Sequence, residues 1–221
     1  MFLQKQIELL KTSREVARFQ KKEENFVKRR FYADFSFKEA DLALKKEYFL
    51  QNPYRLSRRF WNHHVYGETP LTSLEIIGLK ASLSEADRFV DLGAGRGRGI
   101  FFMHYRFGCK VLGIERIPTF IEKALKIQKK LRMEKVEFLQ ADLASSLPPI
   151  QGTVFYLAWT CFEDALVLGM TRWLEQLPNK TKIITVSDPL DKDTFSIVDQ
   201  FSVPFAWGEG DIYIHEKRAS T

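Results

Sequence analysis

The chain has 221 residues, 45% of them hydrophobic, which suffices for one substantial core but not for two full-sized enzymatic domains. Residues 1–60 carry 15 Lys and Arg against 8 Asp and Glu, whereas residues 61–221 carry 19 against 20. The excess positive charge therefore lies in the N-terminal quarter. It predicts either a solvated helical arm or an arm that binds an acidic partner, such as nucleic acid, a protein surface or anionic lipid.

The sequence argues against membrane-spanning, disulfide-bonded and metal-binding classes. No apolar run reaches the roughly 18 residues that span a bilayer, and no signal-peptide pattern follows Met1, so we expect a cytoplasmic location. Cys109 and Cys161 are the only cysteines, and we expect both to be buried as small hydrophobic residues. The four histidines do not pair with carboxylates at metal-site spacing, and we predict no metal.

The N-terminal segment is predicted to be helical. Apolar residues recur at helical spacing from Leu3 to about Tyr48, and Asn52-Pro53-Tyr54 ends that pattern. An aromatic-rich connector over residues 60–70 then leads into a helix from Leu71 to about Leu83.

After this helix, strands and helices alternate, which is typical of a sheet covered by helices on both faces. We expect a basic helical extension over residues 1–60 and a separate domain over residues 61–221. Strands are predicted at Arg88–Leu92, Lys110–Ile114, Val136–Gln140, Val154–Ala158 and Lys182–Val186. Helices are predicted between them at Gly99–Phe107, Thr119–Leu131 and Ala165–Leu177.

The C-terminal segment is predicted to form an antiparallel hairpin. Phe201–Val203 with Phe205–Trp207, and then Ile212–His215, have the composition of strands, and we place a tight turn at Gly208–Asp211. The expected fold class is therefore α/β, with a mainly parallel seven-stranded sheet that ends in this hairpin.

A glycine loop follows the first strand of the domain. Phe89-Val90-Asp91-Leu92 runs directly into Gly93-Ala94-Gly95-Arg96-Gly97, and the next helix begins there. Glycines allow a ligand to approach the backbone closely, which suits either a dinucleotide or S-adenosylmethionine. A dinucleotide loop needs glycine at its sixth position to receive a pyrophosphate, and Arg98 stands there.

The acidic residue before the glycine loop favours S-adenosylmethionine. Asp91 would repel a pyrophosphate but would accept hydrogen bonds, directly or through water, from the cationic amino group of this cofactor. Glu115, at the end of the second strand, is placed to bind ribose hydroxyls. Asp142, after the third strand, is placed to accept from the adenine amino group. We therefore predict a cofactor site with Asp91, Gly93, Gly95, Gly97, Glu115 and Asp142.

A second motif precedes the glycine loop by about twenty residues. Val65-Tyr66-Gly67-Glu68-Thr69 followed by Phe89-Val90-Asp91-Leu92-Gly93-Ala94-Gly95 resembles the Dot1 family of protein lysine methyltransferases in order and spacing. The resemblance extends over roughly residues 60–217. It implies the Rossmann-like fold of class I methyltransferases, S-adenosylmethionine as cofactor and a protein substrate. It also implies that Tyr66, Glu68 and Thr69 contact the cofactor.

The segment after the fourth strand departs from the family pattern. Family members that act on histones carry an Asn pair here, and this chain has Ala158 and Trp159 instead. An Asn-free segment is similar to a smaller Dot1-like branch that methylates lysine on mitochondrial membrane proteins. Backbone carbonyls or Thr160 would then orient the nucleophile.

The expected reaction is in-line attack of a neutral lysine amine on the sulfonium methyl. The free lysine pKa is about 10.4, and an apolar channel would lower it by disfavouring the ammonium form. We expect Thr160, Trp159, Phe162 and Tyr213 to be the catalytic residues, with Trp207 beside them in the channel wall.

Two other functions remain open from the sequence. The fold also serves methyltransferases that act on RNA or on small molecules, although an Asn/Asp-Pro-Pro-Tyr-like motif for a flipped base is missing after the fourth strand. Ala158 and Trp159 are also compatible with a non-catalytic module that binds S-adenosylmethionine. Arg96 and Arg98 oppose the helix dipole, and we expect them to face solvent or a substrate.

Overall fold

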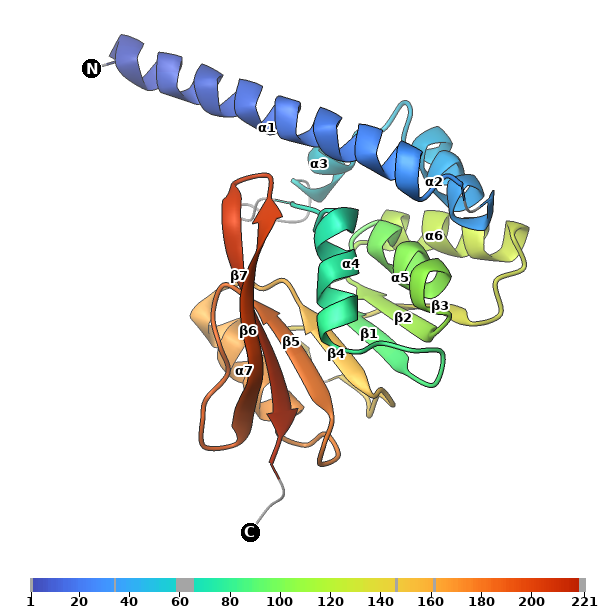
Figure 1. The fold of residues 1–221 in the computed structure, drawn as a ribbon, viewed down its shortest axis with the longest axis vertical. Helices are drawn as coiled ribbons and strands as arrows, with labels where there is room; N and C mark the ends of the chain where they lie inside the picture. The colour runs from blue at the N-terminus through green and yellow to red at the C-terminus, as the bar shows by residue number, and fades with distance from the viewer. Residues whose placement is uncertain (1, 34, 59–65, 146, 161, 219–221) are drawn as a thin grey trace.

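A seven-stranded sheet organises the part of the chain that this computed structural model describes, residues 2–33, 35–58, 66–145, 147–160 and 162–218 (Figure 1). The strand order is β3-β2-β1-β4-β5-β7-β6. Strands β1 to β5 are parallel to one another, and β7 is antiparallel to both β5 and β6, so the predicted sheet is confirmed. The strands are β1 (Arg88–Leu92), β2 (Lys110–Glu115), β3 (Val136–Gln140), β4 (Val154–Leu157), β5 (Lys182–Val186), β6 (Phe195–Phe205) and β7 (Gly208–Lys217).

Helices cover both faces of the sheet, which explains why its central strands are almost continuously apolar. Side chains alternate along β1, so that Phe89 packs under one set of helices and Val90 under the other. The first set is α4 (Leu71–Lys80), α5 (Arg98–Phe107) and α6 (Pro118–Lys130), and the second face is covered by α7 (Asp164–Leu174).

The N-terminal segment forms α1 (Phe2–Arg30), α2 (Phe35–Glu47) and the short α3 (Pro53–Ser57). Asn52 caps α3 by accepting a hydrogen bond from the Tyr54 N–H at 2.9 Å, and Pro53 occupies the first helical position. The Asn-Pro pair that we expected to end the helical pattern therefore also begins a helix.

The N-terminal helices share a core with the rest of the molecule. The ring of Phe102 in α5 lies 4.8 Å from Phe31 and 5.4 Å from Phe37, measured between centroids. Val27 and Leu44 are fully buried in the same cluster. The division at residue 60 into an extension and a separate domain stays a prediction, and the hydrophobic core crosses it.

The predicted position of the C-terminal turn is wrong. β6 continues to Phe205 and β7 begins at Gly208, so that Ala206 and Trp207 form the turn. Gly210 lies within the β7 ladder, where a Cβ atom would come within 2.6 Å of the Phe205 ring. This glycine makes room for the Phe205 ring within the ladder. In the sequence, the same glycine had indicated a turn.

The described helices include none that is long and apolar enough to cross a membrane. Cys109 is buried, as predicted, and burial raises the pKa of its thiol to about 11. Cys161, His63 and His64 lie outside the described residues.

Candidate cofactor site

The glycine loop connects β1 to α5 at the carboxyl edge of the parallel strands. The N–H groups of Gly93 and Ala94 both donate to the Ile114 carbonyl at 2.9 Å. Gly93, Gly95 and Gly97 all have positive φ, which side chains rarely adopt. The loop therefore depends on glycine for its path.

Glu115 holds the middle of this loop from the end of β2. One carboxylate oxygen accepts from the Gly95 N–H at 2.9 Å, and the other accepts from the Ile117 N–H at 2.8 Å. Burial raises the pKa of Glu115, and these N–H bonds oppose that rise. The carboxylate keeps lone pairs on both oxygens at the cavity wall, as a ribose-binding acid requires.

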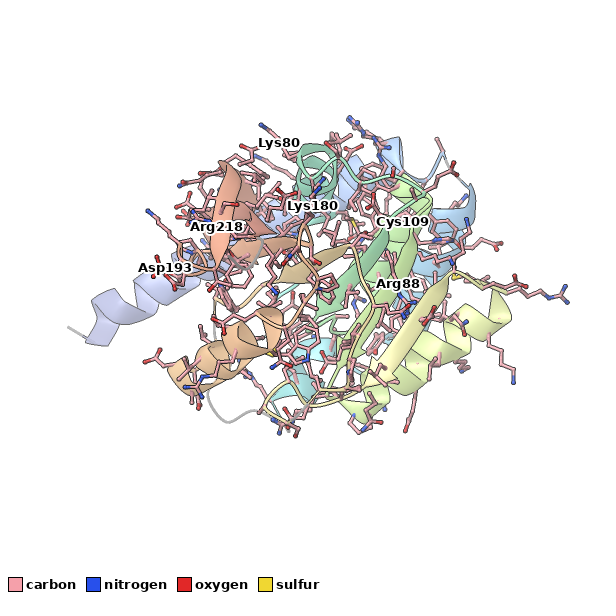
Figure 2. All side chains as sticks on the ribbon, turned by 90° about the horizontal axis from the view of Figure 1, so that it is seen from below. Lys80, Arg88, Cys109, Lys180, Asp193 and Arg218 are labelled. Atoms are coloured by element: carbon pink, nitrogen blue, oxygen red, sulfur yellow. The ribbon has the colours of Figure 1, made fainter. Side chains whose placement is uncertain are left out.

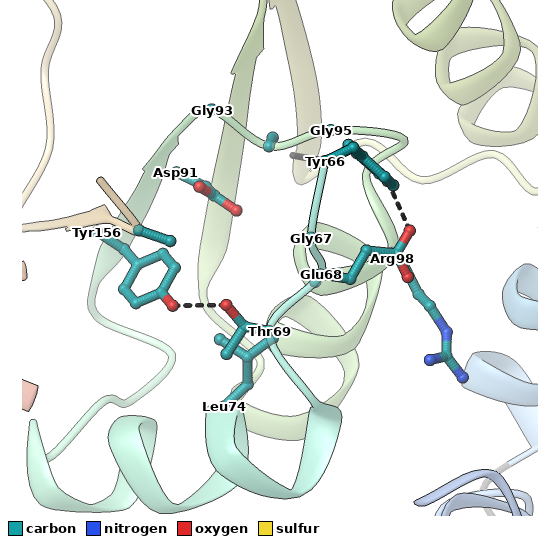
Figure 3. A pocket seen from close by; sticks show the side chains of 13 residues that line it. Tyr66, Gly67, Glu68, Thr69, Leu74, Asp91, Gly93, Gly95, Arg98 and Tyr156 are labelled. Atoms are coloured by element: carbon teal, nitrogen blue, oxygen red, sulfur yellow. Dashed lines mark hydrogen bonds between the residues drawn. The ribbon is translucent and has the colours of Figure 1, made fainter. Parts of the chain in front are cut away.

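Asp91 points into a small pocket beneath the glycine loop (Figure 3). Burial, with a further contribution from Glu115, raises the pKa of its carboxyl to about 7. A cation placed beside Asp91 would favour the ionised form. The carboxyl is therefore suited to receive a positively charged group.

The loop that contains Tyr66, Glu68 and Thr69 lies directly against the glycine loop (Figure 3). The Tyr66 hydroxyl donates to Glu68 at 2.6 Å, and Arg96 binds both oxygens of the same carboxylate. A Cβ atom on Gly95 would lie 3.0 Å from the Tyr66 ring. The two motifs are thus joined by a bidentate ion pair and by close packing. Val65 lies outside the described residues.

Thr69 is connected to the centre of the sheet. Its hydroxyl shares a hydrogen bond of 2.7 Å with the hydroxyl of Tyr156 on β4 (Figure 3). Burial raises the pKa of Tyr156, and the bond to Thr69 partly opposes this. Sequence reasoning missed Tyr156, whose only signal was a hydroxyl within an otherwise apolar strand.

The expectation that Arg96 and Arg98 face solvent is wrong; both line the cavity described below, and a contact with substrate stays a prediction. Arg96 pairs with Glu68, and Arg98 pairs with Asp41 of α2, with Nε 2.7 Å from a carboxylate oxygen. The side chains of Arg96 and Arg98 are only 14% and 15% exposed. Their charges are compensated inside the protein, which outweighs the unfavourable helix dipole.

A cavity of about 820 Å³ opens beside the small pocket and reaches the surface. It adjoins the Tyr66–Thr69 loop, Gly93, Gly95, Glu115 and Asp142. The Asp142 carboxylate also lies 3.5 Å from Arg116 and accepts from the Ala144 N–H at 3.1 Å. Gly97 does not line the cavity; it supports the loop from below, where a Cβ would lie 2.6 Å from Phe138.

The predicted catalytic residues separate into two groups. Thr160, Phe162 and Trp207 line the cavity, whereas the expectation that Trp159 and Tyr213 also line it is wrong. Trp159 is buried in the core on the α7 side, and its indole N–H donates to the Asp188 carbonyl at 3.3 Å. Because neighbouring side chains in an extended segment point to opposite sides, Ala158 and Thr160 face the cavity and Trp159 cannot.

Tyr213 lies in the interior of the sheet ladder. It pairs with Thr185 on β5 and Gln200 on β6, and its ring lies 6.2 Å from that of His215. The cavity opens at the strand ends, away from this position. The composition of β7 did not show which of its residues lie at the edge of the sheet where the cavity opens.

The N-terminal helices supply a wall that sequence reasoning missed. Val16 and Phe19 of α1 and Tyr54 of α3 line the cavity, together with Trp207 of the hairpin turn. Figure 1 shows α1 passing over the end of this hairpin. Within the described ranges, no group of three or more His, Cys, Asp or Glu side chains is arranged to hold a metal.

Known proteins resemble the part of the chain that forms this site. Residues 83–158 match the model of a family described as a methyltransferase domain. A histone-lysine N-methyltransferase, specific for H3 lysine-79, from Dictyostelium discoideum is 26% identical over 166 residues. That alignment covers 66% of this chain, and the chain spans about 9% of the length of the relative.

Solved structures share the fold at low sequence identity. An RNA methyltransferase from Salinibacter ruber, crystallised with S-adenosyl-L-homocysteine, has a TM-score of 0.56 at 22% identity over 70% of this chain and 95% of its own. TrmN from Thermus thermophilus has a TM-score of 0.57 at 14% identity over 73% of this chain and 53% of its own. These matches support a methyltransferase domain and confirm the predicted fold, and they leave the acceptor unidentified.

Proposed function

We propose that this chain is an S-adenosylmethionine-dependent methyltransferase whose acceptor is the side-chain amine of a protein lysine. The observation that carries the proposal is the contact between the two motifs: Glu68 of the Tyr66–Thr69 loop is bound by Arg96 of the glycine loop. The curated histone-lysine N-methyltransferase that the chain resembles supports the choice of acceptor.

The residues around the glycine loop fit S-adenosylmethionine. The positive φ angles at Gly93 and Gly95 leave backbone, without side chains, facing the cavity. Asp91 would hold the ammonium group, Glu115 the ribose hydroxyls and Asp142 the adenine amino group. When bound, the cofactor supplies an electrophilic methyl group on a sulfonium.

An apolar part of the cavity wall, next to the two loops, suits a neutral amine. Ala158, Phe162 and Trp207 give this part of the wall an apolar character, which disfavours an ammonium and lowers the pKa of an entering lysine. The Thr160 hydroxyl accepts from Ser187 at 3.3 Å and keeps a lone pair and a proton for orienting the amine. Alignment of the amine with the methyl group supplies much of the rate in such a site.

RNA is the second candidate acceptor. The exposed face of α1 carries cations that include Arg14, Arg18, Lys21 and Lys22, and such a surface attracts phosphates. The RNA methyltransferase from Salinibacter ruber shares the fold.

The test is transfer of a labelled methyl group from S-adenosylmethionine to separated protein and RNA fractions of a lysate, followed by mass spectrometry. We expect label on lysine that disappears with Asp91→Ala and persists with Asp193→Ala, a change at an exposed carboxylate (Figure 2). Label on RNA alone would show that RNA, and not a protein lysine, is the acceptor. Binding of the cofactor without any transfer would identify a non-catalytic module.

A further inference from the structure

One buried carboxylate of the N-terminal helices reaches the start of the helix that follows the glycine loop. Asp41 of α2 is 1% exposed, and its two oxygens accept from Arg98 Nε at 2.7 Å and Nη2 at 3.3 Å. The Tyr32 hydroxyl donates to it at 2.5 Å, and the Lys45 ammonium lies 3.1 Å away. Burial alone would raise the pKa of Asp41, but Arg98, Tyr32 and Lys45 together hold it well below its usual range.

The partner of Asp41 occupies a position where a cation is unfavourable. Arg98 is the first residue of α5, where the helix dipole and the free N–H groups repel positive charge. It also lines the cavity, directly after Gly97. The ionised Asp41 compensates this charge and, through two hydrogen bonds in a fixed geometry, determines where the first turn of α5 lies.

Two further contacts join the N-terminal helices to the cofactor loops. The Arg96 guanidinium lies over the ring of Tyr48, 5.7 Å from its centroid. The ring of Tyr54 packs against that of Tyr66 at 5.2 Å. The N-terminal helices therefore contact the glycine loop, the first turn of α5 and the Tyr66–Thr69 loop by three separate side chains.

We propose that Asp41 is a positioning residue of the cofactor site, and that the N-terminal helices hold the glycine loop in its binding conformation. This inference rests on the proposed function, because it takes S-adenosylmethionine as the ligand. Linkage makes the effect reciprocal: docked helices strengthen cofactor binding, and bound cofactor strengthens helix docking.

Glu75 provides a matched control. This buried carboxylate on α4 is bound by Arg30 of α1 at 3.0 Å and by Arg106 at 2.7 Å. It ties the same N-terminal helices to the same body, but Arg106 lies in the last turn of α5, away from the glycine loop. Glu75→Gln therefore tests loss of a buried ion pair without a change at the cofactor loops.

The experiment measures the affinity of the full chain for S-adenosyl-L-homocysteine by calorimetry, together with Tm, in wild type, Asp41→Asn and Glu75→Gln. We expect both variants to lower Tm and only Asp41→Asn to weaken binding, by about tenfold or more. Hydrogen exchange gives a second readout: ligand should slow exchange over residues 37–47 in wild type and in Glu75→Gln, and not in Asp41→Asn.

Each remaining outcome decides a different claim. Equal affinities in Asp41→Asn and Glu75→Gln, with wild type binding normally, would overturn the positioning role and leave the proposed function intact. Failure of the wild type to bind would overturn the proposed function itself. If Asp41→Asn does not fold, Arg98→Lys replaces it, because it keeps the charge and loses the two-fold hydrogen bonding; wild-type affinity in that variant would refute the inference.

Discussion

At the residue scale, we expect the charge state of Asp91 to control the affinity of the proposed site. Its pKa of about 7 means that it carries a proton in part of the population at neutral pH. The ammonium group of the cofactor needs the ionised form. We therefore expect affinity for S-adenosylmethionine to fall about tenfold per pH unit as pH drops below about 7, as measured by calorimetry. A flat profile would contradict this.

Asp91→Asn tests the same carboxylate by removing its charge. We expect cofactor affinity to fall by about 10- to 100-fold, because a hydrogen bond to a charged partner contributes about 1.5–3 kcal/mol. The free protein should gain stability, since a carboxyl whose pKa is raised from 3.8 to about 7 by folding destabilises the folded state once it ionises. Thermal unfolding without ligand at about pH 8 checks the sign. A lower Tm in Asp91→Asn would contradict it.

At the scale of elements, the glycine loop is determined by backbone conformation and by lack of space. Gly97 has φ of +82° and faces the ring of Phe138, so an added Cβ has no room. We expect Gly97→Ala to destabilise the protein by more than about 1 kcal/mol in urea denaturation. It should also weaken cofactor binding, because α5 begins at the next residue.

Gly169 in α7 is the control for this substitution. It is exposed within a regular helix, and an added Cβ would meet nothing within 4 Å. Gly169→Ala should therefore stabilise the protein by about 0.5–1 kcal/mol through helix propensity. Equal effects of the two substitutions would show that the conformation of the loop does not require glycine.

At the scale of the whole molecule, burial of His215 makes stability depend on pH. Its Nε2 accepts from the Leu190 N–H at 3.0 Å, and its Nδ1 therefore donates to the Ile183 carbonyl at 3.1 Å. Burial lowers its pKa, and the bond to Ile183 partly opposes this. We expect the contribution of His215 to stability to be complete above pH 6.5 and to fall, by up to about 1.4 kcal/mol per pH unit, as pH drops below that value.

His215→Gln isolates this contribution, because the amide supplies one acceptor and one donor and does not titrate. Between about pH 8 and pH 5, the urea midpoint of wild type should decrease relative to that of the variant. Parallel curves would assign the acid sensitivity to other groups.

Binding of an acidic partner by the basic N-terminal helices remains a proposal about the whole molecule. Part of the positive charge is already paired within the molecule, since Arg30 and Lys45 bind Glu75 and Asp41. Truncation of residues 1–50 would also remove buried core residues, so it is not a clean test. Reversing the charge of exposed Arg14, Arg18, Lys21 and Lys22 should weaken binding to a polyanion and flatten its salt dependence, while Tm stays unchanged. An unchanged salt slope would show that these charges only solvate the helix.

The sequence by itself determined the sheet, the glycine loop and the acidic residues at the strand ends. These features follow from local periodicity, glycine conformation and charge at strand ends, which are readable within short windows. The positions of Trp159 and Tyr213 away from the cavity wall, the turn at Ala206 and the partners of Arg96 and Arg98 were decided only by the tertiary structure. Contacts of this kind depend on residues that are distant in the sequence. Asp41 lies 57 positions before Arg98, and nothing in the sequence around either residue specifies that they form an ion pair.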